Sequence, residues 1–139
     1  MRHTLATIVI VAVGVLFVSV PMGAHHSNAA FDVEKTVTLQ GTVTEWLWSN
    51  PHCLLQFDVK DRNGKVVQHW VTETSNPRDM TNLGWARGSL KVGDQLTVTV
   101  YPARNGRPVG RIFQVALPGG QTLSAFPGGP RGAPGQGAK

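Results

Sequence analysis

The sequence contains almost no cysteine. Cys53 is the single cysteine among 139 residues, so no disulfide can form within the chain even in a compartment that would allow one. A chain of this length can nevertheless bury enough apolar surface for one domain with tails. The fold must therefore be held by its hydrophobic core.

Motifs that carry catalysis are also missing. The chain has no phosphate-cradling glycine loop, no paired-carboxylate pattern and no Ser-His-Asp order. His52 and Cys53 are neighbours, but adjacent residues on a strand point to opposite faces, so they do not form a catalytic dyad. We expect that the protein is not an enzyme.

Acidic residues are fewer than basic ones. The chain has 8 Asp and Glu against 13 Lys and Arg, which gives a formal net charge of +5. Such a balance favours acidic surfaces in general, and nucleic acid is a common partner of small basic barrels. An exported protein does not meet nucleic acid, so we expect no such partner and interpret the charge as a solvated surface.

Residues 1–24 have the order of a secretory signal peptide. A start that carries Arg2 is followed by an apolar run from Leu5 to Val20, then by Pro21 and the small pair Gly23 and Ala24. The run is shorter than the roughly 20 residues of a membrane-spanning helix, although an uncleaved anchor is an alternative. We expect a periplasmic or secreted protein that is not bound to the membrane after cleavage.

Alternation of apolar and polar residues predicts an all-β domain with five main strands. The strands are expected to begin near Val37, Cys53, Val66, Leu96 and Arg111. A short last piece is expected over residues 122–126. Two Asn-Gly dipeptides provide hairpin turns, because they tolerate a positive φ.

One segment, residues 77–87, has helical spacing, with Asn76 as its N-cap and Pro77 at its first position. Three strands, one helix and two strands form the order of a small five-stranded OB-like antiparallel barrel. Gly41 within the long first strand suits a barrel corner. A small antiparallel sandwich is the rival architecture.

The domain boundaries follow from composition. We expect an extended amino-terminal segment over 25–36, the barrel over 37–125 and a disordered Pro/Gly-rich tail over 126–139.

Several short motifs occur in a fixed order along the chain. They are His25-His26-Ser27, Gly41-Thr42-Val43, Trp48-Ser49-Asn50-Pro51-His52, Gly84-Trp85-Ala86-Arg87 and Leu90-Lys91-Val92-Gly93-Asp94. As an ordered set they resemble the exported bacterial Domain of Unknown Function 6152 family. The resemblance implies a small periplasmic β-domain and brings no established activity, substrate or cofactor. Cys53 departs from the family at a position where an apolar residue such as valine is expected, which indicates a buried strand position.

The amino terminus created by cleavage is the candidate metal site. If cleavage follows Ala24, His25 becomes the first residue and offers its amine and a ring nitrogen to one metal ion. His26 or His52 would supply a second imidazole and complete a T-shaped set of three nitrogens. Cu(II) is the metal, and so the cofactor, that such a set favours.

Two other cleavage positions remain open. Cleavage after Gly23 would leave Ala24-His25-His26, in which the histidine third from the amine binds Cu(II) in a square plane together with backbone nitrogens. Cleavage after Ala29, at a cleaner small-x-small site, would discard both histidines, and the pair would then be incidental.

A ligand- or protein-interaction module is the alternative function. Its expected site surrounds the corner at residues 50–52 and is formed by Trp48, Asn50, Trp70 and Trp85. Strand parity places Trp46 and Trp48 on the solvent face, where indoles stack on planar ligands. A bulge near Thr44 would exchange the faces and bury them. The partner of such a module would be a small ligand or another exported protein. Dependence of binding on a metal ion separates the copper-binding function from the interaction module.

Overall fold

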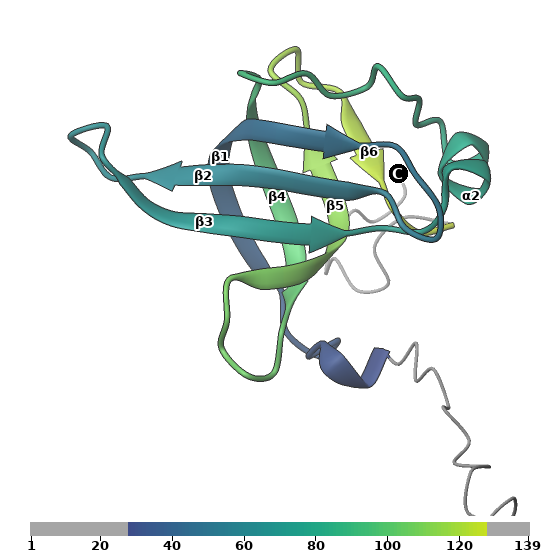
Figure 1. Cartoon of the computed structure of the whole chain (residues 1–139), viewed down its shortest axis with the longest axis horizontal. Helices are drawn as coiled ribbons and strands as arrows, with labels where there is room; N and C mark the ends of the chain where they lie inside the picture. Colours follow the sequence, from purple (N-terminus) through teal and green to yellow (C-terminus); the bar gives the residue numbers. More distant parts are fainter. Residues whose placement is uncertain (1–27, 128–139) are drawn as a thin grey trace, which may run out of the picture.

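The computed structural model describes residues 28–127, which form a closed β-barrel with one short α-helix (Figure 1). The expected signal peptide and nearly all of the expected tail lie outside the described residues. The elements are η1 (Asn28–Ala30), β1 (Val37–Leu47), β2 (Leu54–Lys60), β3 (Val66–Glu73), α2 (Pro77–Asn82), β4 (Gln95–Pro102), β5 (Val109–Ala116) and β6 (Thr122–Ser124). The predicted strand and helix order is confirmed.

The sheet has the order β3-β2-β1-β4-β5-β6, and an additional β3–β5 pairing closes the first five strands into the predicted OB-like barrel. The closing pair is parallel, with Val71 opposite Val109 and Glu73 opposite Arg111. The expectation of antiparallel pairing is therefore wrong for this one pair of strands. Five strands of alternating direction cannot close without bringing two strands of the same direction together.

Strand β1 pairs with two different strands, one along each half of its length. Its first half pairs with β4 and its second half with β2, and Thr42 pairs with both Asp58 and Gln95. The change of partner requires a sharp bend beside Gly41. A Cβ atom added to Gly41 would overlap the Phe57 ring and would lie 3.2 Å from the Asp58 carbonyl oxygen. Glycine is thus required for the close approach of β1 to β2.

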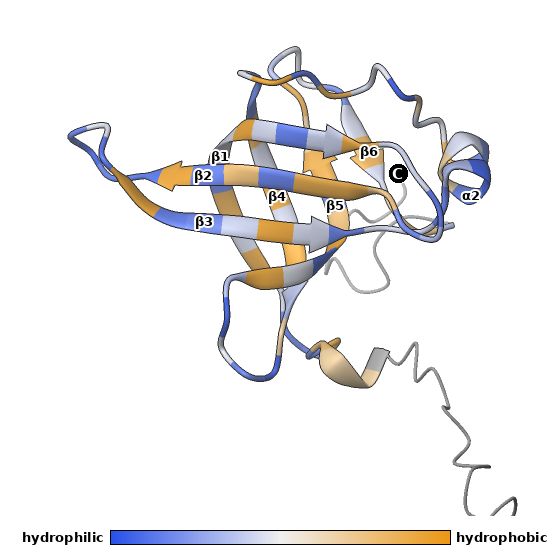
Figure 2. Cartoon of the chain, viewed as in Figure 1, coloured by the Kyte–Doolittle hydropathy of each residue, from blue (hydrophilic) through white to orange (hydrophobic). Residues whose placement is uncertain are grey.

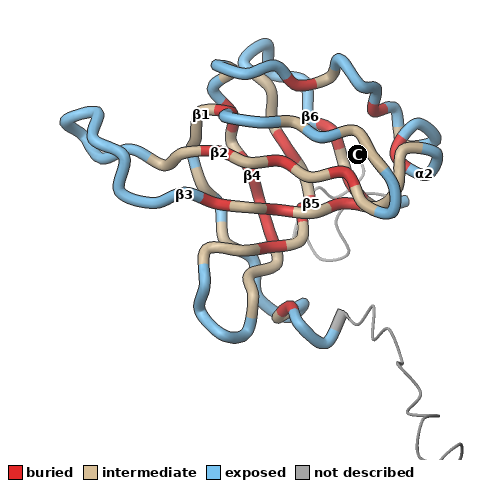
Figure 3. Tube along the Cα trace, in the orientation of Figure 1, coloured by how far each residue is buried: buried red, intermediate tan, exposed pale blue. Residues whose placement is uncertain are grey.

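The core lies inside the barrel, as the alternation of apolar and polar residues predicts. Figure 2 shows hydrophobic positions alternating along the strands, and Figure 3 shows buried positions in β2, β4 and β5. The buried side chains include Val43, Leu55, Phe57, Leu96, Val98, Val100, Ile112 and Val115. The hairpin between β2 and β3 projects beyond this core and is exposed.

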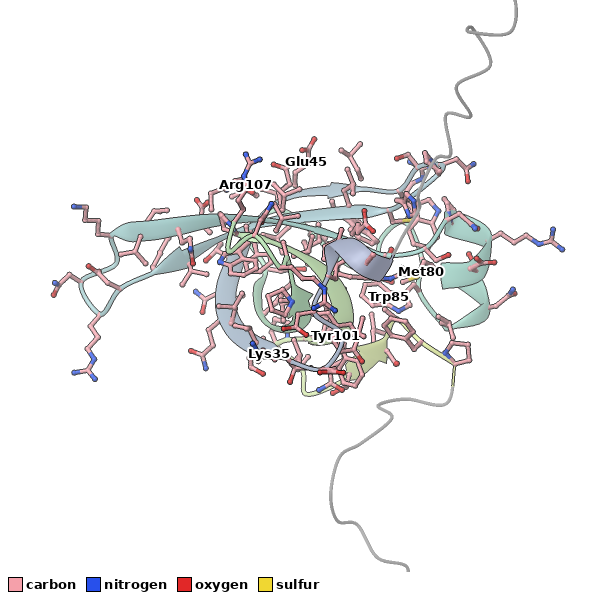
Figure 4. The ribbon with its side chains drawn as sticks, turned by 90° about the horizontal axis from the view of Figure 1, so that it is seen from below. Lys35, Glu45, Met80, Trp85, Tyr101 and Arg107 are labelled. Atoms are coloured by element: carbon pink, nitrogen blue, oxygen red, sulfur yellow. The ribbon has the colours of Figure 1, made fainter. Side chains whose placement is uncertain are left out.

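Helix α2 covers one side of the barrel. The Asn76 side chain accepts a hydrogen bond from the backbone N–H of Asp79 at 3.0 Å, so the predicted N-cap is confirmed. The helix ends at Asn82 rather than near residue 87, because Gly84 adopts a φ of +86° just after the C-cap. Figure 4 shows Met80 and Trp85 between the helix and the barrel, and both are fully buried.

We expect Gly41→Ala to lower the free energy of unfolding by about 1–3 kcal/mol or more, because the new methyl group would displace the Phe57 ring. Gly88→Ala is the matched control, since a Cβ atom at Gly88 meets no atom within 4 Å. Urea denaturation of both variants measures the difference. Equal stabilities would show that the bend tolerates a side chain.

Candidate functional site

The connection between β1 and β2 forms a corner, Trp48–Cys53, that is fastened to the end of β3. Its Asn50–Pro51 peptide bond is cis. The Cys53 N–H donates to the Ser75 carbonyl at 3.0 Å, and the Thr74 N–H donates to the Cys53 carbonyl at 2.9 Å. The corner is therefore held by the same ladder of backbone bonds that joins β2 to β3.

The imidazole of His52 is oriented by this ladder. Its Nδ1 lies 2.8 Å from the carbonyl oxygen of Thr74, a residue that is itself buried. Because a carbonyl oxygen can only accept, Nδ1 carries the proton, and in the neutral ring the lone pair lies on Nε2. A ring fixed through one nitrogen by a backbone carbonyl is the usual arrangement of a metal-binding histidine.

Cys53 lies on the opposite side of the strand from His52. The residue is fully buried, and its Sγ lies 4.0 Å from the Ser49 carbonyl oxygen. Burial raises the pKa of the thiol, which outweighs the lowering effect of its hydrogen bonds. The prediction of a buried strand position is confirmed, and the thiol is unsuited to act as a nucleophile.

A bulge in β1 changes the face on which Trp46 lies. Val43 pairs with Phe57 and Glu45 pairs with Gln56, so Thr44 is an extra residue in β1. Trp46 consequently turns toward the core, with its ring centroid 5.7 Å from that of Trp85. The bulge near Thr44 that was the alternative to strand parity is therefore present. Parity alone assigns Trp46 to the wrong face, although the residue remains half-buried.

The other tryptophans also contribute to packing. Trp48 is half-buried with its ring 5.7 Å from Trp46. Trp70 stacks on Phe57 at 6.5 Å, and the Trp85 indole N–H donates to the Ser124 carbonyl at 2.7 Å. Trp70 is 6% exposed and Trp85 2%.

The expected display of Trp70 and Trp85 around the corner is therefore wrong, because both lie on the inner side of the fold. Trp48 and the exposed Asn50 are the members of that expected set that solvent reaches. The indole nitrogen of Trp46 is buried and has no hydrogen-bond partner among residues 28–127.

The predicted metal ligands are only partly within the described structure. His52 is described, whereas His25 and His26 lie outside the described residues. Within residues 28–127, no group of three or more His, Cys, Asp and Glu side chains is arranged to hold a metal ion. A metal site at the corner would thus require donors from the residues before Asn28.

The segment before β1 is attached to the end of β4. Phe31 forms a bridge with Ala103, the Asp32 N–H donates to the Pro102 carbonyl at 2.8 Å, and the Arg104 N–H donates to the Ala30 carbonyl at 3.0 Å. The described part of this segment includes the 3-10 turn η1 instead of being extended throughout. These bonds fix where the chain enters the barrel.

A polar chain on the outer wall was not foreseen from the sequence. His69 Nδ1 lies 2.7 Å from an Asp58 carboxylate oxygen, and its Nε2 lies 3.1 Å from the Gln56 side-chain oxygen. The Gln56 amide in turn donates to Glu45. The Asn63-Gly64 turn lies midway between Asp58 and His69 in the sequence, so a hairpin centred on this turn would have paired these two residues. Glu45 points away from the barrel in Figure 4.

Comparison with known proteins places the chain in a family. A family described as "Family of unknown function (DUF6152)" matches residues 12–112, which include the corner and the strands from β1 to β4. No match was found among curated proteins or solved structures. No helix within the described part of the chain is long and apolar enough to cross a membrane. Because the family match covers more than half of the sequence, the chain belongs to the DUF6152 family.

Proposed function

We propose that the protein is an exported, non-enzymatic β-barrel that binds Cu(II) through its mature amino terminus and His52. The observation that carries this proposal is the hydrogen bond from His52 Nδ1 to the Thr74 carbonyl. That bond orients the ring and leaves the lone pair on Nε2, the nitrogen that a metal would then bind.

The attachment of the amino-terminal segment supports a contribution from His25. Six Cα–Cα steps separate Phe31 from His25, and they span at most roughly 20 Å when fully extended. They span less, about 16 Å, while Asn28–Ala30 keep the 3-10 turn η1 with its rise of about 2 Å per residue. Across the sheet, the path from Phe31 to Thr72 crosses β4 and β5, which is three strand spacings or roughly 14 Å. Thr74, whose carbonyl oxygen bonds to the His52 ring, follows Thr72 by two residues and lies just beyond the end of β3. Reaching the corner therefore requires residues 25–27 to be fully extended or η1 to unwind.

The donor set supports copper rather than a harder ion. An N-terminal His25 supplies an amine and an imidazole nitrogen, and the His52 ring or the His26 ring adds another imidazole. Cu(II) is the first-row divalent ion that nitrogen sites hold most tightly. All of these groups bind the metal in their deprotonated forms, so the affinity should rise with pH.

The alternative, an interaction module built on exposed indoles, retains less support. Of its four residues, Trp70 and Trp85 are buried in the core. The accessible part of Trp48 and the exposed Asn50 offer only a small surface for a partner.

We expect the exported protein to begin at His25, the start at which one residue supplies both an amine and an imidazole nitrogen. A start at Ala24 would give a different copper site, built from His26 and backbone nitrogens without His52. Intact mass spectrometry of protein recovered after export measures this directly. A protein that begins at Ala30 would lack His25 and His26, and the proposed metal site would be wrong.

We expect mature protein that begins at His25 to bind Cu(II), and His25→Ala to weaken binding by at least about 100-fold, because changes in outer-shell residues alone cost 10–100-fold. His52→Ala should weaken binding less, since His26 can supply an imidazole in its place. Calorimetric titration of protein with its native terminus provides the measurement.

Two controls complete this titration. One added residue before His25 blocks the amine and should act like His25→Ala. His69→Ala removes an exposed imidazole that is bonded to Asp58, away from the corner, and should leave the affinity unchanged. Equal affinities of the blocked and unblocked forms would exclude a site at the amino terminus.

A further inference from the structure

A groove of about 430 Å³ lies on the outer wall of the barrel, where the pairing of β1 changes from β4 to β2. It lies at the end of β2 opposite the His52 corner. Its polar lining comes from Gln40, Thr42, Asp58, Lys60, Gln95 and Thr97, and its rim is formed by Ala116, Leu117 and Pro118. The volume falls within the range of roughly 300–1,000 Å³ that is typical of small-molecule sites.

The strand register brings these polar residues together. Thr42 pairs with Asp58 on β2 and with Gln95 on β4, and Gln40 pairs with Thr97 on β4. The alternate residue Leu96 points into the core, so the polar residues of these rows face outward.

The polar side chains of the groove have unused hydrogen-bonding capacity. Those of Gln40, Thr42, Lys60, Gln95 and Thr97 have no hydrogen-bond or ion-pair partner within residues 28–127. Elsewhere on the same wall, polar neighbours across strands bond to each other. Thr38 and Thr99 do so at 3.2 Å, immediately beside the groove. The groove therefore holds a cluster of donors and acceptors that a bound ligand can use.

The chemistry of the lining favours a neutral ligand rich in hydroxyl groups. Each glutamine amide provides both donors and an acceptor, and each threonine hydroxyl can do either. Lys60 is the one cation in the lining and Asp58 the one anion, so their charges cancel and a strongly anionic ligand gains little. Leu117 and Pro118 provide an apolar rim for C–H groups.

We propose that this groove binds a neutral sugar unit. The site is separate from the copper site in position and in chemistry, and it does not depend on the amino terminus. The shared chemistry fits both a free oligosaccharide and one unit of a longer glycan chain.

The test is a titration of the ¹⁵N-labelled mature protein, followed by NMR, with maltotriose, cellotriose and triacetylchitotriose. We expect at least one trisaccharide to cause saturable shifts in the side-chain amide signals of Gln40 and Gln95 and in the backbone amide signals of Ala116 and Leu117. Co-sedimentation with insoluble starch, cellulose or chitin then separates the two sources. Sedimentation with the polymer identifies a glycan chain, and its absence identifies a free oligosaccharide.

Matched variants test whether the groove itself is responsible. Gln40→Ala and Gln95→Ala should each weaken binding about two- to tenfold, the value of one or two lost hydrogen bonds. Gln121→Ala, at an exposed position outside the lining, should have no effect. The proposal is overturned if none of the three sugars shifts the groove signals saturably, or if binding persists unchanged in both groove variants. The backbone spectrum of each variant reports whether the barrel is intact.

Discussion

The double pairing of β1 is the constraint on which the rest of the structure depends. One strand contacts β4 along its first half and β2 along its second, and the two ladders meet at Thr42. This is what allows five strands to close around a core. The bend needs a residue without a side chain at Gly41, because the Phe57 ring occupies the place of a Cβ atom.

The corner at His52 depends on the barrel in a different way. Thr74 is buried at the end of β3, where its N–H bonds to the Cys53 carbonyl and its own carbonyl faces His52 Nδ1. The bond from Nδ1 to this carbonyl thus ties the orientation of the imidazole to the backbone of the sheet. Such preorganisation is what a metal-binding imidazole requires, since a fixed ring loses little freedom on binding.

Much of the fold could be predicted from residue patterns, whereas the site geometry could not. Alternation correctly located the strand that begins near Cys53, in which Leu55 and Phe57 are buried, and Asn76 with Pro77 correctly located the start of α2. The bulge at Thr44 could be named only as an alternative, because an extra residue is visible only against a partner strand. The groove likewise joins residues of four strands, and no local pattern connects Gln40 with Gln95 before the register is known.

The central functional claim is that His52 and the mature amino terminus bind the same Cu(II) ion. Electron paramagnetic resonance of the exported protein loaded with one equivalent of Cu(II) tests it most directly, because hyperfine couplings report the nitrogen ligands. In a His26→Ala background, which removes the imidazole that could replace His52, we predict that His52→Ala alters the nitrogen couplings, whereas His69→Ala leaves them unchanged. A spectrum that does not change when His52→Ala is added to this background would contradict the claim.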